Sequence, residues 1–289
     1  MTPNELRAAV LAVKRWSRSD QRAPNKPLMM AYALSKYLQG HGQYFDYETE
    51  VDEEVTELLK RFGPARSIYH AEYPFWRLIN DNIWTLNNAE NCIARKSNTD
   101  PSKRELIKHQ VSGGFNAAAY KLIKQDSNLT LELLETILQD SFPQSIVDDI
   151  TRHLGLEFSF KQVQKRDPRF RKEVLRAYNY QCAVCGFDLR MDDISVGLEA
   201  AHIKWKQFHG PCDVNNGLTL CALHHKAFDK GAFTITQDYT IKLSESLNGG
   251  EQAQRLFFDF ESRHIKLPKK DIWLPNIEYL IWHQKEVLK

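Results

Sequence analysis

The sequence contains no uninterrupted apolar run that approaches the roughly 20 residues needed to cross a bilayer. Its first residues also lack the basic start, apolar stretch and small-residue cleavage site of a secretory signal peptide. It has only five cysteines among 289 residues, an odd number that argues against a disulfide framework. These absences predict a cytoplasmic protein with no membrane partner, whose cysteines either bind metal or remain free thiols.

An excess of charge of one sign is also missing, because the formal net charge is only +2. Bulk charge therefore does not indicate a nucleic-acid partner, and any basic footprint must be local. One such footprint lies between residues 160 and 180, where seven Lys and Arg residues stand against two acidic residues, giving 7 − 2 = +5. We expect a basic helix here, at the entrance to a second domain.

The first half of the chain carries apolar residues at helical spacing and is predicted to be mainly helical. The seven acidic residues between positions 46 and 57 are expected to form a solvated helix face, and Ser112-Gly113-Gly114 is expected to form a turn. The boundary between two domains is placed near residue 155, giving domains 1–155 and 156–289. The predicted helices lie at residues 3–16, 28–38, 129–138 and 146–154.

Two ligand pairs in the second domain predict a metal site. Cys182-Ala-Val-Cys185 and Cys221-Ala-Leu-His224 are separated by 35 residues, and two pairs of this spacing complete a tetrahedral Cys₃His zinc site. A structural Zn²⁺ contributes on the order of 10 kcal/mol to folding. We expect that contribution to matter because the loop between the pairs looks polar and offers little core. Of the other cysteines, Cys92 is expected to be a small buried residue and Cys212 a free thiol.

Residues between and after the zinc pairs carry a second motif. Glu199-Ala-Ala-His202 lies between the pairs, Asn216 shortly before the second pair, and His225 and Asp229 at its end. The order His, Asn, His, with steps of 14 and 9 residues, resembles that of the HNH (ββα-metal) endonucleases in their McrA-like form. The resemblance spans roughly residues 170–235. It implies an α+β protein in which a ββα-metal nuclease domain follows a mainly helical domain that reads DNA.

The resemblance also implies roles for these residues. His202 resembles the general base that activates water, and Asn216 the residue that fixes the strand and loop so that His202 is oriented. His225 and Asp229, at i and i+4 of a helix, look like ligands of a catalytic divalent ion such as Mg²⁺ or Mn²⁺. Glu199 occupies a position used to orient a metal-binding histidine.

The sequence departs from this family at one position. Many relatives carry Asp or His directly before the catalytic histidine as a metal ligand, whereas this sequence has Ala201. The metal shell is then expected to rest on His225 and Asp229 with DNA phosphate and water. His224 is assigned to zinc and His225 to catalysis because only His224 keeps the two-residue spacing from Cys221.

The N-terminal half is similar to a second family. Three segments carry the likeness: Arg22-Ala-Pro-Asn-Lys-Pro-Leu28, then Tyr73-Pro-Phe-Trp-Arg-Leu78 with Asp81 and Trp84, and Ser112-Gly-Gly-Phe115. They resemble the sulfur-binding domain that precedes HNH modules in phosphorothioate-dependent type IV restriction endonucleases. The match covers about residues 1–155, with a departure at Asn25, where relatives often carry His.

The implied chemistry of sulfur binding is physically reasonable. Sulfur in place of a non-bridging phosphate oxygen is larger and a poorer hydrogen-bond acceptor. A shallow apolar pocket, such as one formed by Tyr73 and the Pro74 ring, therefore favours it over a strongly hydrated oxygen. Phe75 and Trp76 are expected to be core residues. Basic groups hold the neighbouring phosphates, and the predicted turn at Ser112 offers backbone N–H groups as a nest. The residues assigned to DNA contact are Arg18, Arg22, Asn25, Lys26, Tyr73, Pro74, Ser112 and Gly113.

The sequence therefore predicts a modification-dependent restriction endonuclease that recognises phosphorothioated double-stranded DNA, and a homodimer would supply the two active sites that double-strand cleavage needs. Two alternatives stay open. One is an HNH endonuclease whose first domain reads methylated or hydroxymethylated cytosine, or plain sequence. The other is a non-catalytic zinc-containing DNA-binding protein, against which the intact His202, Asn216 and His225 argue.

Overall fold

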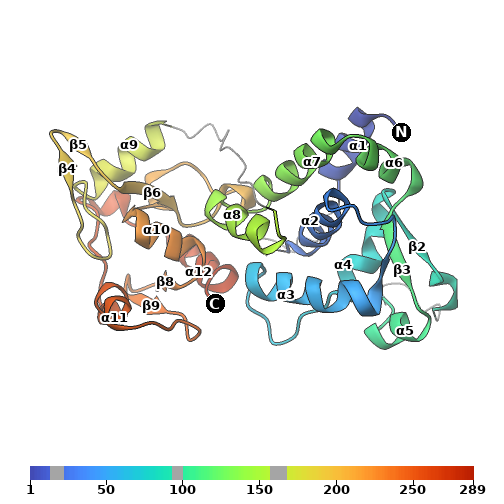
Figure 1. Ribbon diagram of the computed structural model, residues 1–289. Helices are drawn as coiled ribbons and strands as arrows, with labels where there is room; N and C mark the ends of the chain where they lie inside the picture. Colours follow the sequence, from blue (N-terminus) through green and yellow to red (C-terminus); the bar gives the residue numbers. More distant parts are fainter. Residues whose placement is uncertain (14–22, 93–99, 157–167) are drawn as a thin grey trace. The chain divides into compact units, whose positions relative to one another are not determined.

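The computed structural model describes residues 1–13, 23–92, 100–156 and 168–289 of the chain (Figure 1). The chain divides into two compact units, residues 1–160 and 161–289. No helix within the described ranges has both the length and the apolarity that a bilayer crossing requires.

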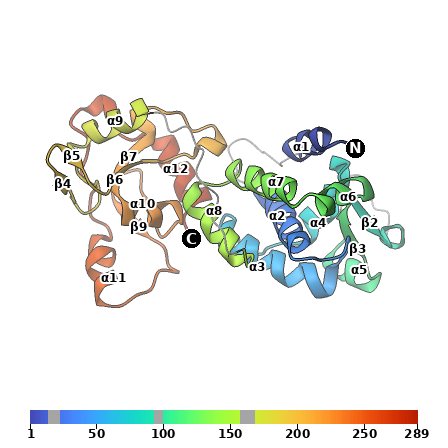
Figure 2. The same cartoon turned by 45° about the horizontal axis from the view of Figure 1, so that its top comes forward.

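The first unit is built around a buried helix. Helix α2, Asn25–Leu38, has ten buried residues and packs against α7, Ser127–Gln139, and Figures 1 and 2 both show the two helices side by side. Helix α1, Pro3–Leu11, begins with a capping box in which Thr2 and Glu5 satisfy each other's backbone N–H groups. It ends five residues before the predicted end at residue 16. The other helices of this unit are α3 (Asp52–Phe62), α4 (Glu72–Arg77), α5 (Lys103–Lys108), α6 (Ala117–Gln125) and α8 (Gln144–His153).

A small antiparallel sheet corrects one prediction. Ser112-Gly113-Gly114 is no turn but the beginning of β3, Ser112–Phe115, which lies between β1, Phe45–Asp46, and β2, Trp84–Asn87. The two glycines are needed for close packing. A Cβ at Gly114 would lie 1.9 Å from the Gln43 carbonyl oxygen, and one at Gly113 would lie 2.9 Å from Phe75 Cζ and from Trp84 Nε1. The extended backbone also excludes the predicted phosphate nest, which requires a turn conformation.

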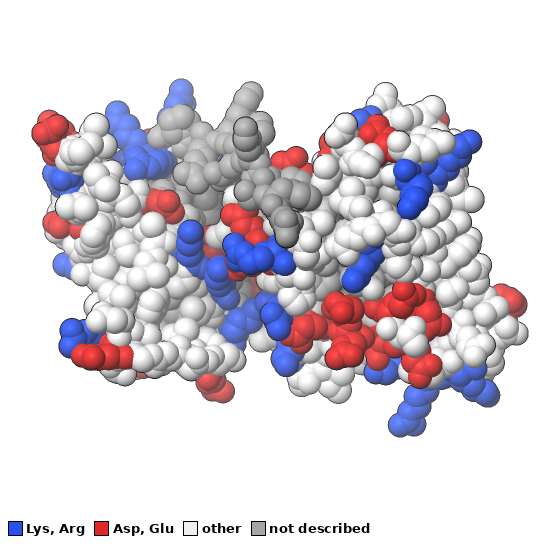
Figure 3. All heavy atoms as spheres, in the orientation of Figure 1, with Lys and Arg blue, Asp and Glu red and all other residues white. Residues whose placement is uncertain are grey.

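The acidic stretch is helical, as predicted, but only in part a solvated face. It comprises a π-helical turn, Tyr47–Val51, and the start of α3, and Figure 3 shows acidic side chains gathered over this region. Glu48, Glu53 and Glu54 are exposed, whereas Glu50 accepts a hydrogen bond from the Asp46 amide and lies 2.6 Å from His41 Nε2.

The second unit contains a ββα arrangement. Strand β6, Leu198–His202, pairs antiparallel with β7, Gly217–Cys221, and helix α10, Ala222–Asp229, follows directly. The predicted basic helix is present as α9, Pro168–Ala177, and packs on both strands. The remaining elements are β4 (Arg190–Met191), β5 (Ile194–Ser195), β8 (Phe233–Ile235), β9 (Ile241–Leu243), α11 (Glu251–Leu256) and α12 (Ile277–Glu286).

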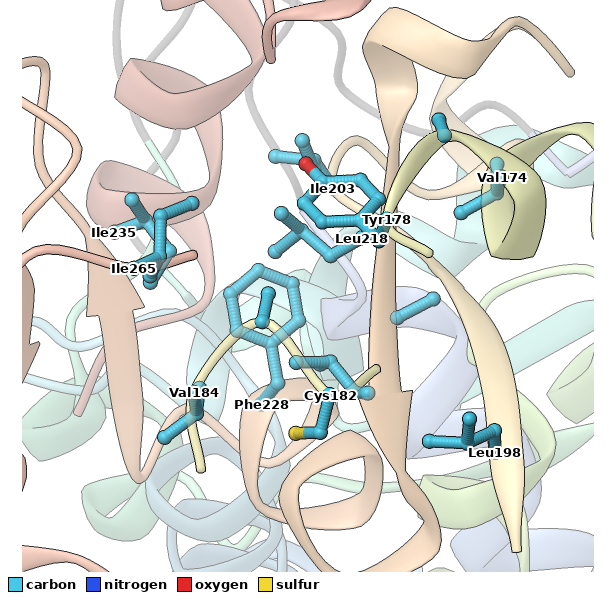
Figure 4. Close-up of a cluster of buried hydrophobic side chains, with 14 of the residues drawn as sticks. Val174, Tyr178, Cys182, Val184, Leu198, Ile203, Leu218, Phe228, Ile235 and Ile265 are labelled. Atoms are coloured by element: carbon cyan, nitrogen blue, oxygen red, sulfur yellow. The ribbon is translucent and has the colours of Figure 1, made fainter. Parts of the chain in front are cut away.

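The core of this unit corrects the expectation that the loop between the zinc pairs offers little core. Leu198, Ala201, Ile203, Leu218 and Leu220 all come from that segment and are almost fully buried. They belong to one buried cluster with side chains of α9 and α10, and Figure 4 labels Leu198, Ile203 and Leu218 of this segment together with Val174 of α9 and Phe228 of α10. These buried residues lie in or directly after β6 and β7, whereas the exposed residues of the segment lie mainly between 187 and 197, before β6.

Candidate active site and metal centre

Four side chains converge beside the strand pair. Each of Cys182, Cys185, Cys221 and His224 offers one ligand atom, and these atoms all lie within 4.8 Å of one another. Among the residues that the structure describes, this is the one group of three or more Cys, His, Asp or Glu side chains close enough to hold an ion. Gly186 follows the first pair with φ +75°, a conformation that glycine adopts without strain, and its amide donates to the Cys182 carbonyl. The sequence-predicted Cys₃His group is thus assembled by the fold.

The chemistry of these donors fits a metal. His224 Nδ1 lies 3.1 Å from Cys221 Sγ and 3.7 Å from Cys182 Sγ, while its Nε2 donates to the Leu256 carbonyl at 2.8 Å. That bond fixes the tautomer that leaves Nδ1 free to coordinate. Hydrogen bonds from Cys185, and then from Cys221, lower the pKa of Cys182, which favours the thiolate that a metal binds.

His202 stands at the end of β6, as predicted. Its ring stacks on Phe170 of α9, with centroids 4.0 Å apart and planes 17° apart, and its Nε2 lies 3.6 Å from Cys212 Sγ. Burial lowers the pKa of His202 to about 4, with smaller contributions from Lys206 and His225. A histidine with so low a pKa is neutral at physiological pH and has a lone pair that accepts a proton.

Asn216 is fully buried and lies directly before β7. Its side-chain amide closes the loop between the two strands. Its Nδ2 donates to the Lys204 carbonyl at 2.9 Å and to the Pro211 carbonyl at 2.8 Å, and its Oδ1 accepts from the Lys204 amide at 2.8 Å. The backbone carbonyl of Asn216 accepts from Ile203, the residue after His202. The asparagine thus holds the loop that begins beside His202.

His225 lies between two carboxylates. Its Nδ1 is 2.5 Å from Glu199 Oε2, and its Nε2 is 3.5 Å from Asp229 Oδ2 one helical turn later. Two ligands at right angles around an ion with bonds of about 2.1 Å lie about 3 Å apart, so the pair on the Nε2 side suits a shared divalent ion. Glu199 contacts the opposite nitrogen and therefore orients the ring. This second group is distinct from the Cys₃His site.

In the first unit, the predicted DNA-contact residues have different environments. Lys26 Nζ lies 2.5 Å from Asp81 Oδ2, and both side chains are largely buried. Tyr73 is half-buried, stacks on His70 with centroids 4.5 Å apart, and has the Arg77 guanidinium 4.8 Å from its ring centroid. Pro74 is buried, so Tyr73 offers the larger accessible surface of the predicted pocket.

The other members of that set are half-buried or buried, or lie outside the described residues. Ser112 is half-buried and its Oγ accepts a hydrogen bond from Asn87 at 3.2 Å, and Gly113 is buried. Asn25 is half-buried at the start of α2. Phe75 is core, as expected, whereas Trp76 is only half-buried. Arg18 and Arg22 lie outside the described residues.

Sequence reasoning missed three contacts: the stacking of Phe170 on His202, the approach of Cys212 to the same ring, and the Lys26–Asp81 pair. A partial signal existed for Phe170, because Phe170, Val174 and Tyr178 recur at helical spacing and predict a buried stripe on α9. The partners of Cys212 and Lys26 are 10 and 55 residues distant and carried no local signal.

The fold and the site define a DNA nuclease of the HNH type joined to a second, mainly helical domain. A family model for the HNH endonuclease matches residues 182–236, and the model for the ScoMcrA-like DNA sulfur-binding domain matches residues 3–159, more than half of the chain. The chain therefore belongs to the ScoMcrA-like family of proteins with a DNA sulfur-binding domain, and its HNH endonuclease domain makes it a nuclease.

Solved structures with some likeness include two sulfur-binding domains in complex with phosphorothioated DNA. That of ScoMcrA is 19% identical with a TM-score of 0.44 and covers 51% of this chain and 95% of that one. That of SprMcrA is 18% identical with a TM-score of 0.44 and covers 54% and 95%. The modification-dependent TagI restriction endonuclease is 23% identical with a TM-score of 0.30 and covers 46% and 41%. These scores are low, and the family assignment rests on the family models alone. No curated protein matches the chain.

Proposed function

We propose that this protein is a restriction endonuclease that recognises phosphorothioated double-stranded DNA and hydrolyses its phosphodiester bonds. The observation that carries the proposal is the presence in one chain of a segment of the sulfur-binding family, 3–159, and a segment of the HNH family, 182–236. Residues 1–155 are the recognition domain and residues 156–289 the nuclease domain, which includes the basic entry helix α9 and a C-terminal extension.

In the nuclease domain, His202 accepts a proton from water as the water oxygen bonds to phosphorus and the bond to the leaving oxygen breaks. Asn216 holds the loop beside His202, and Glu199 holds the His225 ring. His225 and Asp229 would hold a divalent ion such as Mg²⁺ or Mn²⁺, which supplies positive charge to the phosphate oxygens. Cys182, Cys185, Cys221 and His224 would hold a structural Zn²⁺, for which their three sulfurs and one nitrogen are suited.

In the recognition domain, Tyr73 and the adjacent Pro74 contact the sulfur atom. The Arg77 guanidinium lies over the Tyr73 ring, but Asp100 Oδ2, 2.5 Å from Arg77 Nε, offsets its charge. Lys26 supplies less charge than its type suggests, because Asp81 offsets it. Arg18, Arg22, Asn25, Ser112 and Gly113 complete the set of residues proposed to lie along the DNA. The poor hydration of sulfur relative to oxygen gives the preference for the modified strand.

Digestion of three forms of one plasmid tests the function. Phosphorothioated, cytosine-methylated and unmodified plasmid are incubated with the protein and Mg²⁺ or Mn²⁺, with and without EDTA. We expect cleavage of the phosphorothioated form alone, abolished by EDTA. Cleavage of methylated plasmid alone would establish the cytosine-reading alternative, and binding without cleavage of any form would favour a non-catalytic DNA-binding protein.

Binding assays on modified and plain duplexes of one sequence test the sulfur contact. Tyr73→Ala is expected to reduce the preference for the modified duplex about tenfold, a loss of about 1.4 kcal/mol. Tyr44→Ala is the matched control, because Tyr44 is an exposed tyrosine of the same unit outside the proposed site. Equal affinities of the unaltered protein for both duplexes would reject the sulfur contact.

Double-strand cleavage needs two active sites or two visits of one. We propose a homodimer on the DNA, and sedimentation of the protein with a modified duplex checks it. A single protein copy on a duplex that is nonetheless cut in both strands would contradict the dimer.

A further inference from the structure

Two side chains that the family motif does not include contact the His202 ring. Phe170 covers one face, with the ring planes 17° apart, and Cys212 Sγ lies 3.6 Å from Nε2. Phe170 comes from α9, which precedes the matched HNH segment 182–236. Cys212 comes from the loop between β6 and β7. One face and one nitrogen of the imidazole are therefore already engaged before DNA binds.

The position of Phe170 depends on Gly217. This residue pairs with His202 across the two strands, and a Cβ there would lie 3.2 Å from two ring carbons of Phe170 and 2.4 Å from Val174 Cγ2. Because Gly217 of β7 has no side chain, α9 can pack closely against the two strands. The stacked ring restricts the plane of the His202 imidazole, so that little rotational freedom is lost when the reaction begins.

The position of Cys212 depends on Asn216. The Asn216 amide donates to the carbonyl of Pro211, the residue directly before Cys212. The same amide bonds both backbone groups of Lys204 at the other end of the loop. Asn216 therefore fixes the cysteine as well as the chain that leaves His202.

A neutral imidazole has one N–H donor and one lone pair. If the Cys212 thiol donated to Nε2, the lone pair would be engaged and the other nitrogen would carry the proton, leaving no atom to accept a proton from water. If Nε2–H donates to the sulfur, Nδ1 carries the lone pair. Only the second arrangement leaves a base.

We propose that Phe170 and Cys212 are positioning residues for His202, which hold its imidazole as the Nε2–H tautomer so that Nδ1 accepts the proton of the attacking water. This inference rests on the proposed role of His202 as the general base. After transfer, both nitrogens carry protons, and Nε2–H continues to donate to Cys212, so the ring does not have to turn during the reaction.

Nitrogen-15 NMR of the zinc-loaded full chain with Mg²⁺ tests the tautomer without any cleavage. The His202 signals are assigned by their loss in His202→Gln. We expect the Nε2–H tautomer in the unaltered protein and in Cys212→Ser, whose oxygen still accepts, and a mixture of tautomers in Cys212→Ala. The Nδ1–H tautomer in the unaltered protein would overturn the proposal.

Single-turnover cleavage tests the stacking. Phe170→Leu is expected to lower the rate about tenfold to a hundredfold, as a displaced catalytic group does, with DNA affinity and zinc content unchanged. Phe170→Tyr retains the ring and is expected to keep the rate within about twofold. Phe187→Leu replaces an exposed phenylalanine of the same unit and serves as the control. Full rates in both Phe170→Leu and Cys212→Ala would refute the proposal.

The two hypotheses fail differently. Cleavage by His202→Ala at the normal rate would remove His202 from the mechanism, whatever its tautomer. Loss of cleavage in His202→Ala together with the Nδ1–H tautomer would keep His202 as the base and reject the roles of Cys212 and Phe170. Should Phe170→Leu lose its zinc or fold, the tautomer in Cys212→Ala still decides the question.

Discussion

At the residue scale, the low pKa of His202 sets the pH range in which it can act as the proposed base. The pKa of His202 is lowered to about 4, mainly by burial and to a smaller extent by Lys206 and His225. A histidine accepts a proton only when its ring is neutral, so kcat/KM for cleavage is expected to rise with pH through about 4 and to be independent of His202 ionisation near neutral pH. A pH–rate profile on modified DNA measures this.

Replacement of Lys206 tests the cause of that pKa shift. Lys206→Gln removes a positive charge, so the pKa of His202 and the acid limb of the profile are expected to move to higher pH. Lys242→Gln alters an exposed lysine of the same unit and should leave the limb in place. An acid limb of kcat/KM near the ordinary histidine value would show that His202 of the free protein is not desolvated.

The proposed role of Asn216 beside His202 depends on the hydrogen bonds by which its side chain closes the loop between β6 and β7. Asn216→Ala leaves two buried backbone groups of Lys204 and the Pro211 carbonyl without this partner. A lost partner costs about 1–3 kcal/mol for each buried group. We expect a loss of about 3 kcal/mol in the free energy of unfolding of the second unit, together with loss of cleavage. Urea unfolding measures it, with Asn248→Ala at an exposed site as the control. A loss below about 1 kcal/mol would contradict the assigned contacts.

Local sequence was sufficient for some parts of the site and insufficient for others. His225 and Asp229 are one helical turn apart, so local geometry brings these two side chains together. The same holds for the two members within each zinc pair, because each pair has only two residues between its members. The approach of Cys212 to His202 depends on a loop closed by Asn216, and no short spacing encodes it. Tertiary contacts of this kind require the folded chain.

At the scale of the element, helix α9 places Phe170 against the ring of His202. It packs on β6 and β7 because Gly217 leaves room for Val174 and Phe170. Gly217→Ala is expected to cost about 1–3 kcal/mol, the range for overpacking a core, and to slow cleavage by displacing Phe170. Adding Val174→Ala to that variant should restore part of the stability, since the added Cβ lies 2.4 Å from Val174 Cγ2.

A matched glycine separates this clash from a general effect of alanine. A Cβ at Gly42 meets no atom within 4 Å, so Gly42→Ala is expected to leave stability and cleavage nearly unchanged. Equal stability of Gly217→Ala and the unaltered protein, by thermal unfolding, would contradict the role assigned to the close packing of α9.

Strand β3 shows why element type was harder to predict than element position. Ser112-Gly113-Gly114 has the composition of a turn, yet it is the middle strand of the first unit's sheet. The glycines are there because the Gln43 carbonyl and the Phe75 ring leave no space for a side chain. Long helices such as α2 and α7, in contrast, follow from apolar periodicity alone.

At the scale of the whole molecule, the two units have separate cores and separate tasks in the proposed function. Net charge gave no indication of DNA binding because acidic residues over α3 balance basic residues elsewhere, among them those of α9.

The proposed division of tasks between the two units predicts that loss of function in one unit leaves the function of the other intact. His202→Ala is accordingly expected to abolish cleavage while the preference for phosphorothioated duplex persists, which a gel-shift assay checks. Full cleavage would remove His202 from the mechanism.

Removal of the proposed zinc tests the independence of the units most directly. A structural Zn²⁺ contributes on the order of 10 kcal/mol, comparable with the whole stability of a domain. Cys221→Ser is therefore expected to lose its metal, unfold the second unit and abolish cleavage. The first unit contains none of the four ligands, so its preference for phosphorothioated duplex should remain.

Metal analysis measures the bound metal, circular dichroism the folding of the second unit, and gel shifts the preference for phosphorothioated duplex. Cys92→Ser is the control that keeps the metal. If Cys221→Ser loses that preference as well, the recognition domain depends on the folded nuclease domain, and the separation of tasks is wrong.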